Sequence, residues 1–175
     1  MRCLAALLAC LLLTFPLPAQ KEKREPLTRA QSDQIADAAG VPDERIKLFT
    51  KFLEEHATVI KGLTNRAKSA ARVQRLDDEL QDLTALMDEL GVNLDTYSDR
   101  HADIRKALKE LTDATPRWHG ILRALAGEPG FDLSRKEAIE SEEELADQAT
   151  RLLTEQTEYF RVHKDEVGQE RTEPK

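Results

Sequence analysis

The feature that most limits what this chain can fold into is a long, regular spacing of apolar side chains. From Asp43 to Leu90 apolar residues recur at alternating steps of three and four, with no proline and no charge block between them. This spacing places one apolar stripe along a helix and is typical of bundles and coiled coils. The seam consists of Phe49, Leu53, His56, Ile60, Leu63, Ala67, Ala70, Val73, Leu76, Leu80, Leu83, Met87 and Leu90.

An irregularity is expected in the middle of this stretch. Two consecutive three-residue steps meet at Ala70, and such a stammer locally overwinds a helix. Gly62 lies nearby and weakens a helix further. The sequence therefore predicts one long helix or two stacked end to end, with a kink or break between Gly62 and Ala71.

Two further long helices are predicted after it. Gly91 is expected to end the first helix in a turn, and a second seam then runs from Leu94 to Leu125, kinked or restarted at Pro116. Folding this helix back about Gly91 sets Trp118 against small residues, which favours the pairing. Those small residues are Gly62, Ala67, Ala70 and Ala71. After a turn at 127–130, a capping box at Ser134 opens the third long helix.

A short helix precedes the long ones. Thr28 and Gln31 have the spacing of a capping box, and Gly40 followed by Val41-Pro42 ends the helix. The predicted fold is all-α, an antiparallel bundle of three long helices plus a short N-terminal helix, with coiled-coil-like packing. We expect one domain over residues 27–167, a disordered lead-in over 20–26 and a disordered tail over 168–175.

The first residues have the pattern of a signal peptide. Arg2 is followed by an apolar run of 13 residues from Cys3 to Phe15, too short for the roughly 20 residues that span a bilayer. We expect residues 1–19 to be cleaved after Ala19, which makes the mature protein periplasmic or secreted without membrane insertion. Lipidation at Cys10 is an alternative. Both cysteines lie in this segment, so the mature domain has no thiol chemistry.

Charge and motifs narrow the classes of function. Lys and Arg number 26 against 33 Asp and Glu, a net charge of −7, which argues against nucleic acid as a partner. The chain has no glycine-rich phosphate loop, no G-x-S-x-G elbow and no H-E-x-x-H motif. We therefore expect a non-enzymatic protein without a cofactor. The acidic run 140–144 is expected to be a solvated helix face.

The histidines provide the main alternative. His101 and His163 occupy seam positions on different predicted helices, and pairing about Gly130 places them about one turn apart. Facing helices of a bundle build metal and haem sites in this way. Glu79, Asp82 and Glu155 are candidate carboxylate ligands. Half-buried, hydrogen-bonded histidines are the simpler interpretation of the same pattern.

One short motif resembles a known family. Leu27-Thr28-Arg29-Ala30-Gln31 resembles the LTxxQ motif of small periplasmic chaperones, which are exported, helical and poor in disulfides. The resemblance covers these five residues, and a capping box explains them equally well. The expected function is protein–protein interaction in the periplasm or cell envelope, as an adaptor or chaperone-like protein. The partner would be another protein or an unfolded client, or a second copy through self-association.

Overall fold

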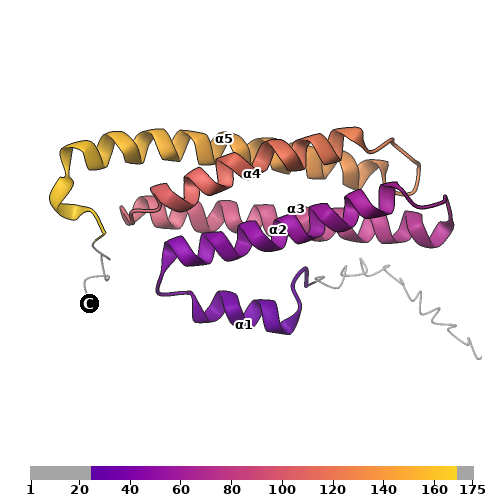
Figure 1. Cartoon of the computed structure of the whole chain (residues 1–175), viewed down its shortest axis with the longest axis horizontal. Coiled ribbons are helices and arrows are strands. Elements are labelled where there is room, and N and C mark those ends of the chain that lie inside the picture. Colours follow the sequence, from indigo (N-terminus) through magenta and orange to yellow (C-terminus); the bar gives the residue numbers. More distant parts are fainter. Residues whose placement is uncertain (1–24, 169–175) are drawn as a thin grey trace, which may run out of the picture.

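The computed structural model describes residues 25–168. Four long helices lie alongside one another, and a short helix lies along one side of them (Figure 1). The helices are α1 (Arg29–Asp37), α2 (Pro42–Thr64), α3 (Ala70–Asp99), α4 (Arg105–Ala124) and α5 (Asp132–Val162), and the 3₁₀ turn η1 (Lys164–Glu166) follows. The predicted all-α class is confirmed, since none of the described residues forms a strand. The predicted signal peptide, residues 20–24 of segment 20–26 and all but the first residue of 168–175 lie outside the described residues.

The number of long helices differs from the prediction because the chain reverses at the expected break, so α2 and α3 lie side by side and are not stacked end to end. The break expected between Gly62 and Ala71 is confirmed, since α2 ends at Thr64 and α3 begins at Ala70. Gly91, however, lies inside α3, which continues to Asp99. A glycine within a helix costs only about 1 kcal/mol relative to alanine, which burial of the flanking leucines offsets. The chain turns instead at 100–104, where His101 has a φ of 54°.

The four long helices form a ring in which each contacts two others. The neighbouring pairs are α2–α3, α3–α5, α5–α4 and α4–α2, and the backbones of the diagonal pairs lie farther apart. α2 and α3 run in opposite directions, since His56 bonds to Glu79, and Leu63, which comes later in α2, bonds to Arg72, which comes earlier in α3. α2 and α4 run in the same direction, since Asp43 accepts from the Ala107 amide and Glu54 accepts from Trp118. The 100–104 connection thus carries the chain from α3 to the diagonally opposite position, where α4 lies.

The predicted environment of Trp118 is therefore wrong. Its indole is fully buried, and Nε1 donates to Glu54 Oε2 of α2 at 2.7 Å. The alanines expected to face it, Ala67, Ala70 and Ala71, are exposed at the 65–69 connection and the start of α3. The pairing failed because it assumed a turn at Gly91 that the chain does not make.

Pro116 is accommodated without a restart of the helix. α4 runs from Arg105 through Pro116 to Ala124. Because proline has no amide hydrogen, the carbonyl of Thr112 loses its usual donor four residues later. The hydroxyl of Thr115 donates to that carbonyl at 3.4 Å instead. This local bond partly replaces the missing one.

The core follows the predicted seam closely. Phe49, Leu53, Ile60, Leu76 and Leu80 are all fully buried. By contrast α1 contacts only α2 among the long helices and buries a single side chain, Ile35, although its predicted capping box at Thr28 is present. No described helix is both long and apolar enough to cross a membrane.

Candidate functional site: the groove between α3 and α5

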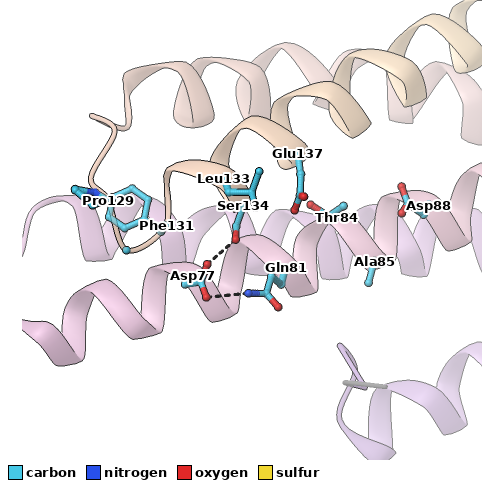
Figure 2. A pocket seen from close by; sticks show the side chains of 11 residues that line it. Asp77, Gln81, Thr84, Ala85, Asp88, Pro129, Phe131, Leu133, Ser134 and Glu137 are labelled. Carbon is cyan, nitrogen blue, oxygen red and sulfur yellow. Dashed lines mark hydrogen bonds between the residues drawn. The ribbon is translucent and has the colours of Figure 1, made fainter. Parts of the chain in front are cut away.

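A shallow groove lies between α3 and α5, and we call it the α3/α5 groove. It consists of one hollow of about 460 Å³ and a second of about 420 Å³ that share Asp88. Figure 2 shows the first hollow, where side chains of α3 face the turn before α5 and the first turns of that helix. The α3 side is lined by Asp77, Gln81, Thr84, Ala85, Asp88, Gly91, Val92 and Asp95. The groove therefore follows several turns of two parallel helices.

Polar hydrogen bonds line the floor of the groove. In each of three bonds an α5 side chain donates to an aspartate of α3, and the three donors are spaced by seven residues. The bonds join Ser134 Oγ to Asp77 Oδ1 at 2.5 Å, Ser141 Oγ to Asp88 Oδ1 at 2.6 Å, and Gln148 Nε2 to Asp95 Oδ1 at 2.7 Å. The parallel register of α3 and α5 is thus fixed by side-chain polarity as well as by the apolar core.

Gly91 has its structural role here. The Gln148 amide also donates to the Gly91 carbonyl at 3.0 Å, and a β-carbon at Gly91 would lie 3.1 Å from Gln148 Oε1. The glycine lets α5 approach α3 closely in mid-helix. The glycine at this position therefore serves the packing of α3 against α5. The predicted turn at Gly91 is wrong.

The groove is strongly acidic and carries exposed apolar side chains. Five carboxylates line it, and Arg151 is the one cation among its lining residues. The carboxylates belong to Asp77, Asp88, Asp95, Glu137 and Glu144. Leu133 and Val92 line its two ends and are each 69% exposed. The groove thus combines charges of one sign with one exposed apolar side chain at each end.

Two histidines bridge helices elsewhere in the bundle. His56 of α2 bonds to Glu79 of α3 through Nδ1 at 2.7 Å, and His119 of α4 bonds to Glu142 of α5 at the same distance. Both glutamates are buried. Burial raises the pKa of the Glu142 carboxyl above its usual range, against the opposing effect of the hydrogen bond with His119.

The raised pKa of Glu142 predicts a specific pH dependence. The folded state binds this proton more tightly than the unfolded chain, so ionised Glu142 lowers stability at neutral pH and the penalty fades as pH falls through the raised pKa. Glu142→Gln should unfold with an equal or higher free energy than wild type at pH 7, by at most about 1 kcal/mol, and the difference should shrink toward pH 4. Urea unfolding at several pH values measures it.

The matched control for this prediction is Glu140→Gln, an exposed change on the same helix. It should show no such trend. A loss of stability in Glu142→Gln that is largest at neutral pH would contradict the assigned effect of burial. The prediction that the run 140–144 is a solvated helix face is only partly right, because Ser141 and Glu142 are buried and the other three residues face water.

The predicted metal or haem residues come together in an unexpected way. The imidazoles of His101 and His163 both stack on the ring of Tyr159, with centroids 4.5 and 4.2 Å away. His163 Nδ1 donates to the Tyr159 carbonyl, and the Tyr159 hydroxyl donates to Glu166 at 2.7 Å. The two histidines are thus neighbours through the ring of Tyr159 that lies between them.

The carboxylates predicted to join these histidines have other partners. Glu79 bonds to His56 and Arg75, and Glu155 pairs with Arg151. Within residues 25–168, no group of three histidine, cysteine, aspartate or glutamate side chains is arranged to hold a metal ion. The metal or haem hypothesis for His101 and His163 stays a prediction without a third ligand among the described residues.

Sequence reasoning missed the α3/α5 groove entirely. The available signal was the repeat of Ser134, Ser141 and Gln148 at seven-residue intervals beside the apolar seam of α5. Polar residues at such positions are typical of contacts between helices. The partners on α3 were not predictable, because the helix pairing about Gly91 was wrong.

Comparison with known proteins adds no relative. The chain matches no protein-family model, no curated protein and no solved structure. The function must therefore be inferred from the site itself.

Proposed function

We propose that this chain is an exported, non-enzymatic protein that binds another protein in the periplasm or cell envelope, as an adaptor or chaperone-like protein. The observation that carries the proposal is the α3/α5 groove, which leaves Leu133 and Val92 exposed at its ends. A third helix or segment laid in a groove between two helices buries such side chains. The pattern of residues 1–19 supports export, and the motif at Leu27–Gln31 is compatible with a chaperone-like role.

The test compares two pairs of matched variants for their effect on an unfolded client. Leu133→Asp with Val92→Asp alters the groove, and Val59→Asp with Val162→Asp alters exposed apolar side chains that do not line it. Wild type and the control pair should slow aggregation of a reduced, unfolded client at a few-fold molar excess. The groove pair should slow it several-fold less.

A second measurement covers a folded partner. A photo-crosslinking residue at position 133 should give a discrete protein adduct in cells that make this protein, and the same residue at position 59 should not. Absence of both the adduct and the effect on aggregation would refute the proposal. A crosslink to a second copy of the chain would assign the groove to self-association.

A further inference from the structure

We propose that the partner of the α3/α5 groove is a cationic amphipathic helix. This inference rests on the proposed function and specifies the chemistry of its partner. Glu137 and Glu144 are exposed, lie seven residues apart on α5, and have no cationic partner in the part of the chain that the structure describes. A partner with lysine or arginine at the same spacing would supply the missing charges.

The negative charge of the groove disfavours nucleic acid, anionic lipid and a second copy of this chain as its partner. Nucleic acid and anionic lipid would be repelled, because five carboxylates and a single arginine line the groove. A second copy of the chain also brings the wrong sign, because its net charge is −7. Charge complementarity therefore favours a positively charged protein segment.

The apolar ends of the groove give the length of that segment. The bonds from Ser134 to Asp77 and from Gln148 to Asp95 show how residues of α3 and α5 lie level. Leu133 and Val92 are then separated along the bundle by about four turns, or roughly 20 Å at ~1.5 Å per residue. A helix of about 14–18 residues spans this distance and can place one apolar side chain at each end.

The conformation of the partner follows from the shape of the groove. Two parallel helices leave a straight furrow between their side-chain ridges, and a third helix packs into such a furrow with its apolar stripe inward. The aspartates of the furrow floor already accept hydrogen bonds from α5. The exposed rim carboxylates Glu137 and Glu144 therefore provide the charge contacts.

The test uses two labelled 18-residue peptides with the same apolar stripe, one with lysine and one with glutamate on its flanks. Fluorescence anisotropy with the full-length mature protein measures their binding. The lysine peptide should bind, its affinity should fall in 0.5 M salt, and the glutamate peptide should bind at least about tenfold more weakly.

Charge-reversal variants locate the binding. Glu137→Lys with Glu144→Lys should weaken the lysine peptide at least about tenfold. Glu110→Lys with Glu140→Lys makes the same change in net charge at exposed positions outside the groove and should change the affinity less than about threefold. Circular dichroism checks that both variants are folded. The salt dependence of peptide binding to wild type tests the charge contacts without any substitution.

Three outcomes would overturn the inference. Equal binding of the two peptides would show that charge does not select the partner. Equal weakening by both double variants would show that the net charge of the chain acts without the groove. Failure of the lysine peptide to bind, while the photo-crosslink at position 133 persists, would refute a cationic helix and leave the proposed function standing.

Discussion

Replacing Trp118 by alanine should lower the free energy of unfolding by about 3–5 kcal/mol, the largest effect we expect from a single substitution in this chain. The indole is fully buried in the four-helix core. Its removal leaves a cavity that neighbouring side chains fill only in part, and Glu54 loses the donor that lies 2.7 Å away. Denaturation followed by circular dichroism measures the loss, because the chain has no other tryptophan to report by fluorescence.

Trp118→Phe is the control that separates packing from hydrogen bonding. It keeps an aromatic ring in the core and removes the donor, while Glu54 keeps Arg117 at 3.2 Å and remains partly open to water. The loss should then be about 1–2 kcal/mol. A loss below about 1 kcal/mol for Trp118→Ala would show that this face of α4 does not pack against α2.

Gln156→Leu should lower the free energy of unfolding by about 2–4 kcal/mol. Gln156 is buried on α5, and both polar atoms of its side-chain amide bond to the backbone of the 100–104 connection. Its Oε1 accepts from the Ile104 amide at 3.1 Å, and its Nε2 donates to the Ala102 carbonyl at 2.9 Å. Leucine has a similar size but leaves two backbone groups without partners. Urea unfolding measures the change. The slope of the unfolding free energy with urea concentration should be the same in the variant and in wild type.

The matched control is Gln148→Leu on the same helix. Gln148 also bonds a backbone carbonyl and a side chain of α3, but it is only half-buried, so water can replace its bonds. That loss should stay below about 1 kcal/mol. Equal losses in the two variants would show that the 100–104 connection does not depend on Gln156.

These two residues also show how far the sequence could predict the fold. The second seam placed Trp118 inward, and both Trp118 and Gln156 are buried. Their partners were not predictable, because partners depend on which helices are neighbours. The wrong turn at Gly91 displaced every contact assigned across it, whereas the pairing about Gly130 placed His163 and His101 near each other, in agreement with their shared stacking on Tyr159.

The candidate site depended even more on tertiary structure. Glu142 belongs to the acidic run 140–144, which was predicted to be a solvated helix face. In the structure its side chain lies inward on α5 and bonds to His119. In the sequence, Asp77 and Asp88 look like ordinary surface charges on a helix. In the structure, serines of α5 lie beside them and donate hydrogen bonds to them. A charge pattern along one helix does not specify which other helix lies against it.

The features that could be predicted from the sequence alone arise within a few turns of one chain segment. These are the all-α class, the capping box at Thr28, the break before Ala70 and the apolar seams, because each depends on local spacing and backbone preference. The number of long helices, the parallel contacts of α2 with α4 and of α3 with α5, and the groove between α3 and α5 became visible in the three-dimensional structure. Those features depend on the burial of residues far apart in the chain, which outweighs the roughly 1 kcal/mol by which a glycine such as Gly91 disfavours a helix.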